Sequence, residues 1–268
     1  MKQFKLIALD LDGTLNNDNR VITEKTKDAL LKAQKSGTRI VLASGRPSSG
    51  FEMEIRELEL MKYHGLTISY NGGLVRDVET EQTIYEKTIP NSLAKEFLRF
   101  VEDFPVTPIV DDGKFIYTNT PDGFQVQYES SANHLMIKEV DNISDSIDFP
   151  PVKILLASPE ETLRPNIEKI KNPYRENLNF LLSTPFYLEV TMPGISKSHT
   201  LNHICQKYGI LREEVIAFGD GENDISMLEF AGTGVAMGNG CEAIKKIADE
   251  ITLSNNEDGI AHTLLKYL

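Results

Sequence analysis

Residues 6–14 are Leu6-Ile7-Ala8-Leu9-Asp10-Leu11-Asp12-Gly13-Thr14, an apolar run followed by two closely spaced carboxylates and a glycine. Short apolar runs without polar alternation are typical of strands that are buried on both faces. Comparable runs occupy residues 40–43, 66–70 and 215–218, and each is closed by small or polar residues. The sequence therefore predicts buried strands at these places, each ending in residues that could carry chemistry.

A helix is predicted between the first two strands. Residues 23–35 carry an apolar stripe, Thr23 can cap the start, and Gly37 follows the end. The alternation of strand and helix returns late in the chain, where we expect a helix at 197–208, a strand at 215–218, a helix at 223–230, an extended segment at 234–237 and a helix at 260–267. This alternation predicts an α/β fold with a Rossmann-like, doubly wound parallel sheet.

The middle of the chain, residues 83–190, has a different pattern. Its apolar runs are short and are interrupted by prolines. The expected elements are strands at 115–117 and 153–156 and helical stretches near 93–101 and 163–170. We interpret this segment as an inserted α+β domain, so that the core is discontinuous and consists of residues 1–82 and 191–268.

The composition limits the classes of partner. The chain has 268 residues, with 28 lysines and arginines against 40 aspartates and glutamates, and a formal net charge of −12. This balance argues against nucleic acid as a partner, because a polyanion needs a basic surface. With 40% hydrophobic residues, the chain can bury a sizeable core. The motifs specify no oligomeric state.

The number of cysteines and the hydropathy of the chain indicate the cellular compartment in which we expect the protein. Cys205 and Cys241 are too few for a disulfide scaffold or a thiolate zinc site. The apolar run before Asp10 is too short for a signal peptide, and no stretch approaches the roughly 18 apolar residues that span a bilayer. We therefore expect a cytoplasmic protein with no membrane segment.

Polar residues follow the predicted strands at the sheet edge where open α/β folds bind their ligands. They are Asp10 and Asp12, then Ser44, Gly45 and Arg46, then Asn71 and Gly72, and finally Asp220, Asn223 and Asp224. If the strands are parallel, these residues converge on one edge of the sheet.

The carboxylates in this set suggest both a catalytic and a metal-binding role. Asp10 and Asp12, in different environments, could act as a nucleophile and as a general acid or base. Asp220 and Asp224 would add oxygen ligands and complete a hard, anionic cluster suited to Mg²⁺. The lack of paired His or Cys residues argues against zinc or copper. An EF-hand is excluded, because Gly13 is at position four, and not six, counting from Asp10.

Each motif alone also has a structural explanation. These explanations are a polar turn at Asp10 and Asp12, a hairpin turn at Asn71-Gly72, a helix cap at Asn223 and a solvated Lys197. Lys197 is nevertheless unusual, because a cation in the first turn of a helix opposes the helix dipole by about 0.3–1 kcal/mol. If Lys197 faces the carboxylates, it can keep Asp10 ionised and bind an incoming anion.

Together, these motifs resemble those of the haloacid dehalogenase superfamily of aspartate-nucleophile phosphatases. They occur in the order Asp10-Leu11-Asp12-Gly13-Thr14-Leu15, Ala43-Ser44-Gly45-Arg46, Lys197 and Gly219-Asp220-Gly221-Glu222-Asn223-Asp224. The large insertion and the approach Pro193-Gly194-Ile195-Ser196-Lys197 are similar to the Cof-like subgroup. This resemblance implies a catalytic core at 1–82 and 191–268 and an α/β cap domain at 83–190.

The resemblance also implies a phosphoaspartyl mechanism with Mg²⁺ as cofactor. Asp10 would be the nucleophile, and Asp12 the general acid and base. The implied metal site consists of Asp10, the backbone carbonyl of Asp12, and Asp220, with Asp224 and Asn223 nearby. The implied phosphoryl and substrate contacts are Ser44 and Lys197, the backbone around Leu11 and Gly45, and Arg46, Asn71 and Gly72.

The expected activity is hydrolysis of small phosphomonoesters such as sugar phosphates, nucleotides or phosphorylated cofactors. A phosphotransferase or phosphomutase is an alternative, because it would form the same phosphoenzyme. A receiver-like signalling protein is a weaker alternative, since it too uses an acidic Mg²⁺ site, an acceptor aspartate and a lysine at sheet ends. The length, the insertion and the Asp-x-Asp spacing argue against it.

Overall fold

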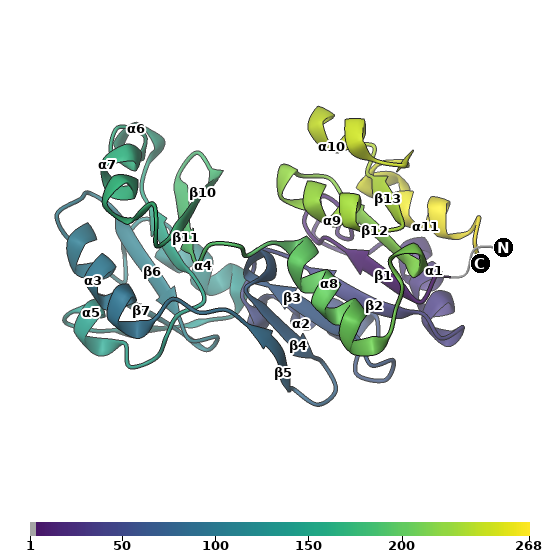
Figure 1. Cartoon of the computed structure of the whole chain (residues 1–268), viewed down its shortest axis with the longest axis horizontal. Coiled ribbons are helices and arrows are strands. Elements are labelled where there is room, and N and C mark those ends of the chain that lie inside the picture. Colours follow the sequence, from purple (N-terminus) through teal and green to yellow (C-terminus); the bar gives the residue numbers. More distant parts are fainter. Residues whose placement is uncertain (1–3) are drawn as a thin grey trace. The chain divides into compact units, whose positions relative to one another are not determined.

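The first apolar run forms β1 (Leu6–Leu9), which is buried throughout. This strand lies inside an eight-stranded sheet (Figure 1). The structure is a computed structural model that describes residues 4–268. The order of the described strands is β14 (Glu250–Ile251), β13 (Thr233–Ala236), β12 (Val215–Gly219), β1, β2 (Arg39–Ala43), β3 (Leu66–Ser69), β4 (Leu74–Asp77) and β5 (Thr83–Glu86). Strands from β14 to β3 pair in parallel, and β4 pairs antiparallel with β3. The carboxyl ends of these parallel strands therefore lie at one edge.

Helices cover both faces of this sheet. Ala29, Leu30 and Ala33, the apolar stripe expected between the first two strands, pack in a core cluster with Ile7 and Leu9 of β1. Leu6 and Ala8 point to the other cluster, together with residues of the late helices. The helices are α1 (Glu24–Lys35), α2 (Glu52–Glu57), α8 (Lys197–Tyr208), α9 (Ile225–Phe230), α10 (Glu242–Ile247) and α11 (Gly259–Leu264). The predicted doubly wound α/β class is confirmed.

Several predicted boundaries are confirmed or shifted slightly. Thr23 caps α1, since its hydroxyl accepts a hydrogen bond from the Thr26 N–H at 3.4 Å. Helix 197–208 is found with the predicted bounds. The helix expected from Asn223 instead begins at Ile225, after a 3₁₀ turn over Glu222–Asp224. Asn223 is therefore not the cap of this helix, and its side chain can make a contact elsewhere.

The inserted segment forms a sheet of its own, six-stranded among the described residues. Its order is β10 (Asn179–Thr184), β11 (Tyr187–Thr191), β9 (Ile154–Ala157), β6 (Thr107–Asp111), β7 (Phe115–Thr118) and β8 (Met136–Glu139). Most of its pairings are antiparallel, and only β7 and β8 run parallel. The connections include α3 (Asn91–Val101), α4 (Val126–Asn133) and α5 (Ile143–Ser146).

The prediction of one continuous helix in the insertion was wrong. The stretch 163–170 is divided between α6 (Glu160–Leu163) and α7 (Ile167–Lys171). Pro165 lies between them. Proline has no N–H for the helical ladder, and its ring clashes with the carbonyl of the preceding turn, so a continuous helix cannot pass this point without a kink or break.

The chain divides into two compact units. One comprises the described residues up to Arg46, Phe51–Tyr85 and Ser196–Leu268, and the other comprises Pro47–Gly50 and Glu86–Ile195. Figure 1 shows the purple start and the yellow end of the chain within the eight-stranded unit. Within residues 4–268, none of the helices combines the length and apolar character that crossing a bilayer requires.

Candidate active site

Lys197 connects the two ends of the chain at the carboxyl edge of the eight-stranded sheet. Its Nζ donates a hydrogen bond to Asp10 Oδ1 and another to Asp224 Oδ1, both at 2.6 Å. The lysine is only 1% exposed. It is held at the start of α8 by Ser196, whose hydroxyl accepts from the His199 N–H at 3.1 Å. Lys197 is thus not the solvated lysine that the sequence alone allowed.

Electrostatics keep this lysine charged. Burial by itself lowers the pKa of Lys197, but the adjacent Asp10 and Asp224 outweigh burial and raise that pKa above its ordinary value. A buried ammonium is stable only with such partners. The lysine therefore brings a permanent positive charge to a site that is otherwise anionic.

Three carboxylates meet beside Lys197. One oxygen each from Asp10, Asp220 and Asp224 lies within 4.8 Å of the others. Burial, followed by the charge of Asp224, raises the pKa of Asp10 although Lys197 opposes this. Burial also raises the pKa of Asp220. Hard carboxylate oxygens at this spacing suit a small divalent cation, which would favour the ionised forms of these buried carboxyl groups.

Local hydrogen bonds hold two of these carboxylates in place. The Thr14 hydroxyl donates to Asp220 Oδ1 at 2.8 Å. Asp224 Oδ2 accepts from the backbone N–H groups of Asp220 at 3.1 Å and Gly221 at 3.0 Å. These hydrogen bonds fix the positions of the Asp220 and Asp224 carboxylates.

Gly13 gives Asp220 the space that it occupies. Its φ of +84° is strained for a side-chain-bearing residue, and a Cβ built there would lie 2.4 Å from Asp220 Oδ2. Gly72 has a comparable role at the start of α8, because a Cβ there would lie 2.3 Å from the carbonyl oxygen of Ser196. Both glycines allow a close approach that positions a charged residue.

Asp12 lies apart from the three clustered carboxylates. Its side chain is 59% exposed, and Arg46 binds both of its oxygens. The Arg46 Nε donates to Asp12 Oδ2 at 2.9 Å, and Nη2 of the same guanidinium pairs with Oδ1. Of the four aspartates predicted at the metal site, the structure brings three side chains together and directs the fourth to an arginine.

The other predicted residues surround this cluster. Ser44 is buried; its hydroxyl accepts from the Arg46 N–H at 3.2 Å, and its carbonyl accepts from the Asn71 N–H at 2.9 Å. Asn71 accepts from the Asn223 side chain at 3.3 Å. Asn71 also lies in the turn between β3 and β4, so the hairpin explanation and the proximity to the site both hold.

Two predicted backbone positions lie in the same loops. The Leu11 carbonyl accepts from the Thr14 and Asn16 N–H groups, whereas its side chain is buried in the core. A Cβ at Gly45 would lie 3.0 Å from the Asn71 side-chain nitrogen. Leu11 therefore contributes backbone to the site, and Gly45 allows Asn71 to pack closely.

Sequence reasoning missed Thr14 and Glu54. Glu54 is 1% exposed, accepts a hydrogen bond from Asn16 and faces Arg46. Thr14 belongs to the motif that begins at Asp10, but the sequence pattern alone indicates no role for it. A signal for Glu54 was present, because it lies between the apolar residues Met53 and Ile55 on a short helix that is flanked by the buried residues Phe51 and Leu58.

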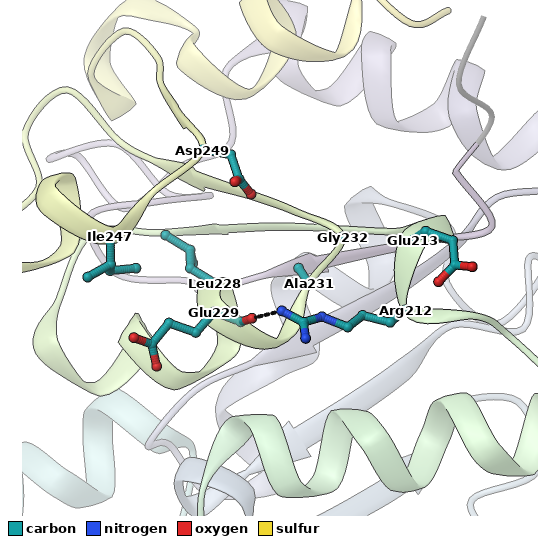
Figure 2. Close-up of a pocket in the computed structure, with 8 residues that line it drawn as sticks. All are labelled: Arg212, Glu213, Leu228, Glu229, Ala231, Gly232, Ile247 and Asp249. Carbon is teal, nitrogen blue, oxygen red and sulfur yellow. Dashed lines mark hydrogen bonds between the residues drawn. The ribbon is translucent and has the colours of Figure 1, made fainter.

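A separate hollow of about 540 Å³ lies at the opposite edge of the same sheet (Figure 2). Its lining includes Arg212, Gly232 and Asp249, which directly or closely precede β12, β13 and β14. The Arg212 guanidinium donates to the Glu229 carbonyl oxygen. With the carboxylates of Glu213, Glu229 and Asp249 in its lining, this hollow is poorly suited to an anionic substrate.

Comparison with known proteins agrees with this geometry. The family model of haloacid dehalogenase-like hydrolases matches residues 7–264. The crystal structure of a haloacid dehalogenase-like hydrolase from Bacteroides thetaiotaomicron superposes with a TM-score of 0.94 at 37% identity, covering 99% of this chain and 100% of that one. The chain belongs to the family of haloacid dehalogenase-like hydrolases.

Two further proteins bear on the enzyme class. The 5-amino-6-(5-phospho-D-ribitylamino)uracil phosphatase YitU of Bacillus subtilis is 30% identical over 271 residues, covering 98% of this chain and 97% of YitU. The subclass IIB sugar phosphatase BT4131 superposes with a TM-score of 0.81 at 28% identity, covering 98% of each chain. These similarities place the chain among phosphoric monoester hydrolases, and not among receiver-like signalling proteins.

Proposed function

We propose that this protein is a Mg²⁺-dependent phosphatase that hydrolyses small phosphomonoesters through an aspartyl-phosphate intermediate. The observation that carries the proposal is the bridge from Lys197 to both Asp10 and Asp224 within one buried cluster of carboxylates. An aspartate can attack a phosphate dianion only where positive charge offsets their repulsion. Lys197 and a divalent cation together supply that charge.

The donor set fits a magnesium ion. Asp10, Asp220 and Asp224 offer closely spaced carboxylate oxygens, and the backbone carbonyl of Asp12 follows in the same loop. Mg²⁺ prefers oxygen ligands and is held in enzymes by a few carboxylates together with substrate phosphate. When bound, the ion would polarise the phosphoryl group and neutralise charge that develops in the transition state.

The chain's own residues take defined roles in this proposal. An Asp10 oxygen attacks phosphorus, and Asp12 gives a proton to the leaving alcohol and then removes one from the water that hydrolyses the acyl phosphate. Lys197 uses two of its three N–H donors on Asp10 and Asp224, and we assign the third to a phosphoryl oxygen. The Ser44 hydroxyl and nearby backbone N–H groups bind the remaining oxygens.

The names of two relatives support the proposed substrate class. YitU is named for a phosphoribityl compound and BT4131 as a sugar phosphatase. We infer that this chain also acts on a small phosphorylated metabolite of the sugar, nucleotide or cofactor type. We assign residues 83–190 as the cap domain and residues 1–82 and 191–268 as the catalytic core, with Arg46, Asn71, Gly72 and Asn223 as substrate contacts.

The test is turnover of p-nitrophenyl phosphate by purified protein with Mg²⁺ and with EDTA. We expect EDTA to abolish phosphate release and added Mg²⁺ to restore it. Asp10→Asn should remove activity, whereas Asp28→Asn, an equivalent change at an exposed position of α1, should leave it unchanged. Turnover that survives EDTA, or an Asp10→Asn enzyme as active as the wild type, would contradict the mechanism.

A further inference from the structure

Glu54 is a buried carboxylate in a place where an apolar side chain would pack. It lies on α2 and is 1% exposed, with Phe51 and Leu58 buried nearby in the sequence. Burying a charge costs free energy, and replacing a buried charge with a hydrophobic residue is often neutral or stabilising. The presence of Glu54 therefore calls for an explanation beyond stability.

One oxygen of Glu54 contacts two loops of the active site. Oε1 accepts a hydrogen bond from Asn16 Nδ2 at 2.6 Å, and the same oxygen lies 3.6 Å from Arg46 Nη1. Asn16 belongs to the loop that follows Asp12, and Arg46 belongs to the loop that follows β2. Glu54 is thus the common anchor of two segments that carry predicted catalytic residues.

Two routes of contacts connect Glu54 to Asp12, one through Arg46 and one through Asn16. Arg46 binds Glu54 through Nη1 and Asp12 through Nε and Nη2, so two carboxylates hold opposite sides of its guanidinium. On the other side, Asn16 pairs with Asp12 through an isolated backbone bridge, and the Asn16 N–H donates to the Leu11 carbonyl at 2.9 Å. Both the backbone and the carboxylate of Asp12 are therefore tied to Glu54 through one intermediate residue.

The geometry of Arg46 makes this anchoring directional. A guanidinium presents its donors in a rigid, planar fork, so fixing one edge also fixes the direction of the others. Arg46 is only 21% exposed, whereas the Asp12 side chain is 59% exposed. Without an anchor, a carboxylate as exposed as that of Asp12 would sample several rotamers.

We propose that Glu54 is a positioning residue that acts through Arg46 to fix the orientation of the Asp12 carboxylate for proton transfer. This inference rests on the proposed function, because it assigns Asp12 as the general acid. Glu54 does not touch the reacting atoms. Its removal should impair the proton-transfer step selectively and should leave the phosphoryl-binding cluster around Lys197 intact.

The experiment compares two esters whose leaving groups need the general acid to different degrees. Phenol resembles a tyrosine side chain, with a pKa of about 10, and needs protonation as it leaves. The p-nitrophenolate ion is a much better leaving group and needs little. We expect Glu54→Gln to lower kcat/KM for phenyl phosphate about tenfold more than for p-nitrophenyl phosphate, because general acid catalysis is worth about 10²–10⁴-fold.

A second variant distinguishes a selective loss of activity from a folding defect. Glu54→Met keeps a similar volume without burying a charge, so it should fold and show the same selective loss. The matched control is Glu52→Gln on the exposed side of the same helix, which should change neither rate. Circular dichroism and thermal unfolding of each variant check that the fold is retained.

A double-variant cycle tests the route through Arg46. Arg46→Lys removes the fork, and because Arg46 is also assigned as a substrate contact, the rates for both esters should fall, that for phenyl phosphate more than that for p-nitrophenyl phosphate. If Glu54 acts through Arg46, adding Glu54→Gln to Arg46→Lys should cause little further loss. Equal losses on both esters, no loss on either, or fully additive losses would overturn the proposal. If wild-type turnover does not depend on Asp10, the proposed function fails independently of Glu54.

Discussion

The ammonium of Lys197 lies 2.6 Å from a carboxylate oxygen of Asp224, and this pair is almost completely buried. The same ammonium contacts Asp10 at the same distance. One lysine therefore serves two acids that come from opposite ends of the chain. This shared contact makes the proposed phosphoryl site and the fold of the eight-stranded unit depend on each other.

Lys197→Met should reduce both stability and activity. It leaves two buried carboxylates without their cation, and breaking a buried ion pair costs about 3–5 kcal/mol. Activity on p-nitrophenyl phosphate should fall by about 10²–10³-fold, the usual effect of losing one preorganised electrostatic contact. Urea unfolding and steady-state kinetics measure these changes. A variant with wild-type stability in EDTA would contradict the role of the bridge.

Gly13→Ala should weaken Mg²⁺ binding by displacing the Asp220 carboxylate. The new Cβ would be placed 2.4 Å from Asp220 Oδ2, and φ there is positive. Gly37→Ala is the matched control, because φ is also positive but nothing lies within 4 Å of the new Cβ. The control should lose only the cost of the left-handed conformation, about 1–2 kcal/mol. Only Gly13→Ala should also raise the Mg²⁺ concentration required for half-maximal activity; equal requirements in both variants would exclude the steric argument.

Mg²⁺ should stabilise the folded protein. A ligand that binds only the native state raises the free energy of unfolding, by about 2.7 kcal/mol at a concentration 100-fold above Kd. Differential scanning calorimetry should show a Tm that rises with Mg²⁺ and falls when EDTA is added. Asp220→Asn should reduce this rise, whereas Asp28→Asn should not. A Tm that is insensitive to Mg²⁺ would argue that the three carboxylates hold no divalent ion.

The two cysteines should differ in reactivity. Burial raises the pKa of the Cys205 thiol to about 11, whereas Cys241 is partly exposed. At pH 8 a disulfide reagent should reach the partly exposed Cys241 rapidly, and it should modify Cys205 only after unfolding, because Cys205 is buried and the raised pKa of its thiol leaves little of the reactive thiolate. Since the pKa of Cys205 is raised in the folded state, its contribution to stability is present below the ordinary thiol pKa and is lost as pH rises toward 11. Rapid modification of both cysteines in native protein would contradict this.

Much of the fold could be predicted because local signals agree with the tertiary structure. Thr23 caps α1, and the four apolar runs form strands whose carboxyl ends share an edge. The convergence of Asp10 with Asp220 and Asp224 followed from that edge. The break at Pro165 was missed, although proline is the residue that ends helices, because the surrounding apolar spacing is helical on both sides.

Side-chain partners within the site were harder to anticipate. The sequence places Asp10 and Asp12 two residues apart, but the chain turns between them, so that one is buried beside Lys197 and the other pairs with Arg46. Nothing in the spacing of Arg46 and Glu54 indicates their contact, because a glutamate in a short helix is usually solvated. Tertiary contacts between loops determine these pairings.

The place of β1 has a consequence for synthesis on the ribosome. β1 pairs on one side with β2, which emerges soon after it, and on the other with β12, whose register joins Leu6 to Val215. A nascent chain therefore carries an apolar strand with one unpaired edge until more than two hundred further residues have been translated, and such an edge can pair with other chains. A translation product that stops before Val215 lacks the β12 partner of β1 and a carboxylate of the proposed metal site, so we expect it to aggregate and to have no phosphatase activity.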